Sequence, residues 1–150
     1  MKRNSLALLL ILFVSSFAAL KAQDYKVGLG VRLSSSSPTL SNSVTFKYFM
    51  NEKSALEGLV SFGSRFGIGG LYEVHKPTTA TGLKWFFGGG AYIGFQDGNT
   101  YFGPTGIIGL DYKFTNVPLN LSLDWKPELD IIPSINFVPD AFALSARFTF

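Results

Sequence analysis

Residues 141–150 read AFALSARFTF and end the chain on an aromatic residue. Two sets of side chains alternate along this stretch, one mostly apolar (Phe142, Leu144, Ala146, Phe148, Phe150) and one small or polar (Ala141, Ala143, Ser145, Arg147, Thr149). Successive side chains of a β-strand point to opposite faces, so one face of this strand is apolar and the other carries a charge. In water such a terminal strand would invite pairing with other chains, whereas in a bilayer it is suitable if the sheet closes on itself.

The N-terminus has the pattern of a cleavable secretory signal peptide over residues 1–22. Lys2 and Arg3 precede an apolar run that a pair of serines interrupts, and cleavage is expected after Ala22. The alternative, an uncleaved anchor, needs about 20 apolar residues in a row, which this run does not reach. We therefore expect export through the inner membrane and a mature domain over residues 23–150.

Removal of the signal peptide leaves a neutral chain. Three of the 13 basic residues lie within residues 1–22, so ten remain against ten acidic ones. Nucleic-acid binding, which would need a basic surface, loses its support. The chain has no cysteine, which excludes disulfides, a thiolate metal site and a lipid-modified cysteine. The 128 residues of the mature chain suffice for one domain.

The mature chain shows strand-period alternation and no helical stripe of useful length. Eight segments of about ten residues alternate in this way. They cover residues 25–33, 43–50, 55–62, 67–75, 83–95, 102–113, 119–126 and 141–150. The sixth is the least regular, because Pro104 cannot donate to a ladder and nearby glycines leave room for a bulge. The predicted fold is all-β: an eight-stranded antiparallel up-and-down transmembrane β-barrel.

An even number of strands places both termini at one end of the barrel. If that end is periplasmic, short turns fall near residues 51–54, 76–82 and 114–118, and longer outer loops near residues 34–42, 63–66, 96–101 and 127–140. Aromatic residues on the oily face near the strand ends then form two girdles. The periplasmic girdle is Tyr25, Tyr48, Trp85 and Tyr112, and the outer girdle is Phe62, Phe95, Trp125 and Phe137.

The polar face of the strands predicts a charged barrel interior. The candidate lumen residues are Lys26, Arg32, Lys47, Glu57, Glu73, Lys84, Asp111, Asp124, Lys126 and Arg147, with Asn120 beside them. Buried charges persist when they are paired, and we expect Lys47 to pair with Glu57, and Lys84 with Glu73 or Asp111. Side chains fill the interior of a barrel of this size, so we expect a plugged lumen. The alternative is that a few of these charges lie in solvent at strand ends.

Alternation alone does not say which face is inward. A soluble lipocalin-like or streptavidin-like barrel would bury the apolar face around a ligand and expose the charged one. Aromatic residues near the strand ends on the apolar face, and glycines on the charged face, favour the membrane arrangement. The soluble secreted ligand-binding barrel is the alternative.

The chain resembles small eight-stranded outer-membrane barrels of the OmpA transmembrane-domain, OmpX and OmpW kind, especially the compact outer membrane protein β-barrel domain common in Bacteroidetes-like Gram-negative bacteria. The resemblance covers residues 23–150 and is carried by the terminal strand and by residues 118–127, PLNLSLDWKP. It implies location in the cell outer membrane, contact with its lipid, and recognition of Phe148 and Phe150 by the outer-membrane assembly machinery. We expect a monomer.

Catalytic, cofactor and metal sites have no support in the sequence. Barrels that modify lipid A use a His-Ser-acid arrangement at the outer leaflet, but His75, the single histidine, falls at the periplasmic end of its strand and lacks a serine partner. One histidine and scattered carboxylates define no metal-ligand spacing. The glycine runs lie within strands, so they are not phosphate loops. We expect no enzyme activity and no cofactor.

Two roles remain open for such a barrel. The first is structural or adhesive, with outer loops that contact a surface partner. The second, which the OmpW resemblance allows, is transport of a small hydrophobic ligand into the outer membrane. Residues 34–38 are polar, whereas residues 131–137 are apolar for an exposed loop and would face a partner or lipid, unless the last two strands extend above the bilayer.

Overall fold

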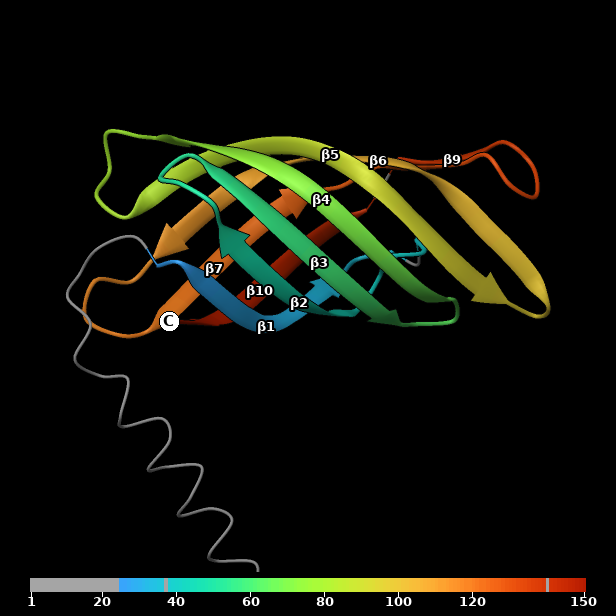
Figure 1. Ribbon diagram of the computed structural model, residues 1–150, viewed down its shortest axis with the longest axis horizontal. Helices are drawn as coiled ribbons and strands as arrows, with labels where there is room; N and C mark the ends of the chain where they lie inside the picture. Colours follow the sequence, from blue (N-terminus) through green and yellow to red (C-terminus); the bar gives the residue numbers. More distant parts are fainter. Residues whose placement is uncertain (1–24, 37, 140) are drawn as a thin grey trace, which may run out of the picture.

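The computed structural model describes residues 25–36, 38–139 and 141–150; the expected signal peptide and its cleavage site lie outside them. The described residues form ten strands (Figure 1). These are β1 (Val27–Ser34), β2 (Ser43–Phe49), β3 (Ser54–Phe62), β4 (Phe66–Pro77), β5 (Leu83–Gln96), β6 (Asn99–Lys113), β7 (Leu119–Trp125), β8 (Glu128–Asp130), β9 (Asn136–Val138) and β10 (Phe142–Thr149). None of the described residues belongs to a helix that is long and apolar enough to cross a membrane.

The sheet closes on itself. Strands β1 to β7 pair antiparallel in sequence order, and the terminal strand β10 lies between β7 and β1. Leu29 is opposite Phe148 on one side of the closure, and Arg147 is opposite Asn120 on the other. The predicted eight-stranded antiparallel barrel is therefore confirmed, with the terminal strand as its closing strand.

The short strands β8 and β9 extend the last two barrel strands beyond the closed part. Strand β8 follows β7 after Pro127 and contacts β6 through the pair Thr105 and Glu128. Strand β9 pairs with β8 and leads into β10. Figure 1 shows this hairpin, in orange and red, projecting from the same end of the barrel as the β5–β6 hairpin. The apolar residues 131–137, expected in an outer loop, lie mostly at its tip.

Strands β5 and β6 form a long hairpin with an unbroken register from Leu83 opposite Tyr112 to Gln96 opposite Asn99. Its turn is Asp97-Gly98, and both residues have positive φ (50° and 77°), as a two-residue hairpin turn requires. The bulge considered near Pro104 does not interrupt this ladder. Even-numbered residues of β6 donate their N–H groups on the edge of the strand that faces away from β5, where Gly106 N bonds to Pro127 O. Pro104 has no N–H to donate on this edge, and at its position β7 has given way to β8.

The barrel has an apolar exterior and a polar interior. Large apolar side chains are exposed on its outer face, for example Leu29, Phe46, Ile68, Ile108 and Leu144. The largest fully buried side chains include Arg32, Arg147, Lys47 and Lys126. This is the reverse of a water-soluble barrel, in which apolar side chains fill the interior.

Candidate functional site in the barrel interior

The barrel has two ends, named here by what they carry. The terminal end holds Tyr25 and Phe150, and the loop end holds the β5–β6 and β8–β9 hairpins. Charged side chains are gathered in the interior near both ends. We call Lys47, Glu57, Glu73, Lys84, Asp111 and Arg147 the terminal cluster, and Arg32, Arg65, Asp124, Lys126, Glu128 and Asp130 the loop cluster.

Lys47 and Arg147 hold the carboxylates of the terminal cluster. Lys47 Nζ lies 2.8 Å from Glu73 Oε2 and 3.6 Å from Glu57 Oε2. Arg147 also forms an ion pair with Glu57 and donates to Ser122 Oγ at 2.7 Å. All these side chains are buried, so each charge depends on its partners in place of water.

Two further polar groups complete the contacts around Arg147. Its Nε donates to Thr45 Oγ1 at 3.1 Å, and its Nη1 donates to the Asn120 side-chain oxygen at 3.2 Å. The guanidinium therefore joins side chains from β2, β3 and β7 across the interior. Arg147 lies on the terminal strand, so the last strand of the barrel supplies the residue whose contacts link these three strands inside the barrel.

His75 is a buried lumen residue. Its ring stacks on Phe86 with centroids 4.9 Å apart, and its Nε2 lies 3.4 Å from Glu73 Oε2. The Phe49 ring also contacts the His75 ring, with centroids 4.7 Å apart, so the surroundings are two aromatic rings and a carboxylate already engaged by Lys47. The absence of enzyme activity stays a prediction.

Tyr25 and Lys26 lie on the faces opposite to those expected. Tyr25, predicted in the girdle, is buried in the lumen, and Lys26, predicted in the lumen, is exposed with its Nζ 5.6 Å from the centre of the Tyr48 ring. The cause is a β-bulge: the backbone N–H groups of Lys26 and Val27 both donate to Phe150 O, at 3.1 and 3.2 Å. One extra residue on this strand reverses the alternation before Val27.

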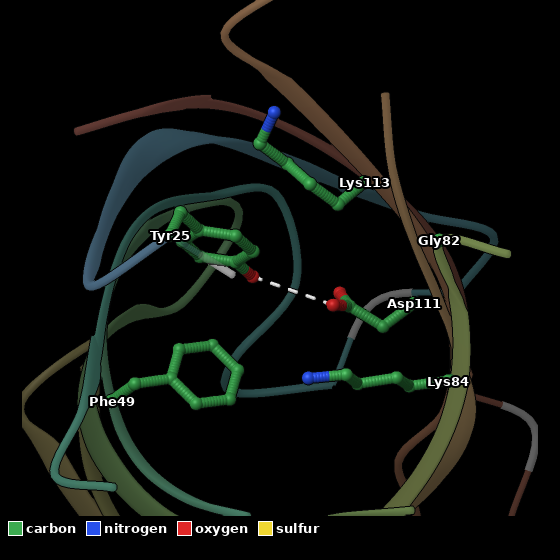
Figure 2. Close-up of a pocket in the computed structure, with 6 residues that line it drawn as sticks. All are labelled: Tyr25, Phe49, Gly82, Lys84, Asp111 and Lys113. Carbon is green, nitrogen blue, oxygen red and sulfur yellow. Dashed lines mark hydrogen bonds between the residues drawn. The ribbon is translucent and has the colours of Figure 1, made fainter. Parts of the chain in front are cut away.

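The inward turn of Tyr25 closes the terminal end. Figure 2 shows its hydroxyl directed toward Asp111, to which it donates at 3.4 Å, with Lys84 below this pair and the Lys113 ammonium directed away from it. The cavity between these residues and Phe49 has a volume of about 10 Å³, room for about one water molecule. Burial, together with the nearby charge of Asp111, raises the pKa of the Tyr25 hydroxyl well above its usual range.

Cysteine labelling tests the bulge directly, because the chain has no native cysteine. We expect Lys26→Cys in the folded protein to react with a water-soluble maleimide at least about tenfold faster than Tyr25→Cys, since buried thiols are inert. After denaturation in urea, both variants should react equally. Faster labelling at position 25 in the folded protein would mean that the strand alternates without a bulge.

An apolar cluster lies in the interior beside the charged ones. It consists of Leu40, Leu59, Leu71, Phe86, Tyr92 and Ile107. Leu40 belongs to the β1–β2 loop, yet it is fully buried. A Cβ atom on Gly69 would lie 2.4 Å from Leu40 Cδ1, so the missing side chain of this inward-facing glycine makes room for the loop. The β1–β2 loop therefore folds into the barrel.

The loop cluster holds this inserted loop. Glu128 accepts hydrogen bonds from the backbone N–H groups of Thr39 and Leu40, at 2.7 and 2.9 Å, and from Lys126 Nζ at 2.6 Å. The second ion pair of the cluster joins Arg32 Nη2 to Asp124 Oδ1 at 2.6 Å. One carboxylate thus satisfies two loop amides and one buried ammonium.

A third ion pair joins the loops at the mouth of the barrel. Arg65 Nη1 lies 3.2 Å from Asp130 Oδ1 and donates to Thr39 Oγ1 at 2.7 Å. The guanidinium carbon of Arg65 lies 3.3 Å from the centre of the Tyr101 ring, and Tyr92 donates to Asp130 Oδ1 at 2.8 Å. These contacts connect the β3–β4 loop to the β5–β6 hairpin and to β8.

Each charged cluster is balanced. The terminal cluster holds three cationic and three anionic side chains, and so does the loop cluster. A balanced set avoids an uncompensated charge in a low-dielectric interior. Lys47 does contact Glu57 as expected, but Glu73 is held by Lys47, with Lys84 opposite Asp111 in the β5–β6 register.

Arg65, Glu128 and Asp130 are lumen residues that were not predicted from the sequence. A signal was present for two of them: polar residues occupy every second position from Asn120 to Asp130, and this alternation passes through Pro127. The expected strand ended at Lys126, one residue before that proline. Arg65 lies in a loop, where alternation has no meaning, so only the contacts with Asp130 identify it.

The remaining girdle residues lie outside the barrel. Tyr48, Trp85 and Tyr112 are on its outer face toward the terminal end, and Phe62, Phe95, Trp125 and Phe137 are on its outer face toward the loop end. Phe148 and Phe150 contact each other with ring centroids 5.2 Å apart. The described residues contain no group of three or more histidine, aspartate or glutamate side chains arranged to hold a metal ion.

Comparison with known proteins gives a limited result. No protein-family model matches the chain, and no curated protein sequence matches it. A solved structure that is similar to it is the crystal structure of Neisserial surface protein A (NspA), with 14% sequence identity and a TM-score of 0.49 over 83% of this chain and 93% of that one.

Proposed function

We propose that this protein is a small integral outer-membrane barrel that does not conduct ions and that acts at the cell surface through its loop end. The observation that carries the proposal is the inverted distribution of side chains. Ion pairs such as Arg147 with Glu57 are sequestered inside, while Leu29, Phe46 and Leu144 face outward. A closed barrel with such an exterior satisfies all backbone groups within a bilayer.

The same distribution disfavours a soluble ligand-binding barrel. A lipocalin-like protein keeps an apolar cavity for its ligand and a charged exterior. Here the interior holds two charged clusters, an apolar cluster and an inserted loop, and Leu33 on the outer face is 60% exposed. The expected signal peptide and the aromatic end of the closing strand, Phe148 and Phe150, support assembly into an outer membrane.

The filled interior supports a role other than transport. Arg147, Lys47 and Leu40 occupy the cross-section from several sides, and each is fully buried. These buried side chains support a lumen without a path for a hydrophobic ligand. The β5–β6 and β8–β9 hairpins project furthest at the loop end (Figure 1), and Ile135 at the tip of the second is 82% exposed. We propose these hairpins as the surface that meets a partner.

Planar-bilayer recording tests the closed lumen. We expect no stable conductance from the purified folded protein, because ion pairs and Leu40 fill the barrel. The same sample must show heat-modifiable gel migration and recovery in the membrane fraction, which establish that barrels are inserted. A reproducible conductance step would refute the closed lumen, and a soluble monomer without heat-modifiable migration would refute the membrane assignment.

A further inference from the structure

Three exposed lysines form a basic arc at the terminal end. Lys26 lies just before β1, Lys53 lies in the β2–β3 turn, and Lys76 lies near the end of β4. The β2–β3 turn that holds Lys53 also holds one exposed acidic residue, Glu52. The outward-facing surface of the loop end, among the described residues, exposes Asp97 and no lysine. The exterior is thus electrically asymmetric between its two ends.

Two of these lysines lie over aromatic rings of the girdle. Lys26 Nζ is 5.6 Å from the centre of the Tyr48 ring, and Lys76 Nζ is 5.5 Å from the centre of the Trp85 ring. The long aliphatic stems therefore run along the apolar surface while the ammonium groups reach the level of lipid headgroups. Lys26 belongs to the basic arc only because the β-bulge turns its side chain outward.

An apolar groove lies on the outer face next to this arc. It has a volume of about 590 Å³ and runs over β2 to β5. Aromatic and aliphatic side chains form its wall and glycines its floor; among them are Phe46, Tyr48, Leu56, Gly58, Gly70 and Tyr72. A groove of this volume on a membrane-facing surface accommodates part of an acyl chain.

Packing within the barrel does not require the glycines of the groove floor. A Cβ atom at Gly58 or Gly70 would meet nothing within 4 Å, whereas a Cβ at the inward-facing Gly30 would lie 1.9 Å from Ala146 O. Glycine in a strand interior costs stability and contributes no side-chain contact. Gly58 and Gly70 are opposite each other in the β3–β4 ladder, so together they keep a hollow in the exterior.

The groove and the basic arc are continuous. Tyr72 lines the groove and donates through its hydroxyl to Ser54 Oγ at 3.0 Å, and Ser54 follows Lys53. Tyr48 lines the same groove and carries Lys26 over its ring. Lys76 lies four residues after Tyr72 on β4, on the same outward face. An elongated molecule with an apolar tail and an anionic head matches this arrangement.

We propose that the groove and the basic arc form a binding site for an anionic phospholipid of the leaflet at the terminal end. The acyl chain would lie along Gly58 and Gly70, and the phosphate would lie against Lys26, Lys53 and Lys76. The proposal rests on the proposed function, since it needs a barrel within a bilayer. A second copy of the chain fits less well, because copies with the same membrane orientation, joined groove to groove, would bring two basic arcs together.

Fluorescence quenching by brominated lipids tests the site. The chain has two tryptophans, so Trp125→Phe leaves Trp85, beside Lys76, as the reporter. The folded variant is placed in phosphatidylcholine vesicles that contain either dibrominated phosphatidylglycerol or dibrominated phosphatidylcholine at the same mole fraction. We expect phosphatidylglycerol to be enriched about fivefold or more at Trp85, given the attraction of several lysines for an anionic headgroup.

Variants separate the two parts of the site. Combined replacement of Lys26, Lys53 and Lys76 by glutamine should remove the enrichment, and replacement by arginine should keep it. Gly70→Ile should fill the groove and reduce the enrichment by at least about half. Ala146→Ile is the matched control, because this outward small residue lies on β10, between β1 and β7 and away from the groove over β2 to β5.

The outcomes distinguish this proposal from the proposed function. Equal quenching by the two lipids in the parent protein would overturn the lipid site and leave the membrane barrel standing. Quenching by neither lipid would overturn membrane insertion itself. Enrichment that survives the glutamine variant unchanged would also overturn the site.

Discussion

Replacing Glu57 with glutamine is expected to lower the free energy of unfolding by about 3–5 kcal/mol, because it leaves buried cations without a counter-charge. Glu57 pairs with Arg147 and lies 3.6 Å from Lys47 Nζ, and all three side chains are buried. Glutamine has nearly the shape of glutamate, so the loss reports charge and not packing. Urea titration of the folded barrel in short-chain lipid vesicles, followed by its heat-modifiable gel band, measures the change.

The double variant Glu57→Gln with Arg147→Met identifies the cause of that loss. It restores equal numbers of cations and anions in the terminal cluster, so we expect it to recover part of the stability. Glu52→Gln in the exposed β2–β3 turn is the control for removal of a carboxylate, and it should unfold like the parent protein. A Glu57→Gln variant as stable as this control would contradict the balanced-cluster interpretation.

Replacing Glu128 with alanine is expected to release the β1–β2 loop from the barrel and to cost about 3–5 kcal/mol. The substitution removes the acceptor of the Thr39 and Leu40 amides and leaves the buried Lys126 without its carboxylate. We expect hydrogen exchange at these two amides to accelerate by at least about a hundredfold, since the carboxylate that accepts both of their hydrogen bonds is lost.

Amides elsewhere provide the control for that experiment. The Leu29 and Phe46 amides belong to the paired barrel strands β1 and β2, so their exchange should change much less than that of Thr39 and Leu40. Asp97→Asn removes an exposed carboxylate at the tip of the β5–β6 hairpin and should leave the exchange of both loop amides unchanged. Slow exchange at Thr39 and Leu40 in Glu128→Ala would mean that Leu40 packing alone holds the loop.

Much of the barrel could be predicted because its physical basis is periodic. A strand with one apolar face and one charged face places alternate residues on opposite faces. Arg147, Glu73 and Lys47 could therefore be assigned to the charged face from their positions alone. The same regularity indicated the closing role of residues 141–150. The turn residues Asp97 and Gly98 fit the two-residue turn of the longest hairpin, and this turn is shorter than the outer loop expected near residues 96–101.

The parts that could not be predicted depend on interruptions of that period. One bulged residue opposite Phe150 moves Tyr25 inward and Lys26 outward. No residue type in this stretch indicates a bulge. Leu40 stands in a loop, where alternation carries no information, and its burial depends on Gly69 on a distant strand. The polar alternation of β7 continues after Pro127, although the expected strand ended just before this proline.

The antiparallel barrel and the apolar and charged faces of its strands could be predicted from the amino-acid order alone. These follow from side-chain direction along each strand, which is a local property. Three further features emerge in the folded barrel: Glu73 lies against Lys47, Glu128 holds the inserted loop, and Lys26 lies with Lys53 and Lys76 beside a groove. These contacts depend on the register between strands and on closure of the sheet, which bring together residues far apart in the chain.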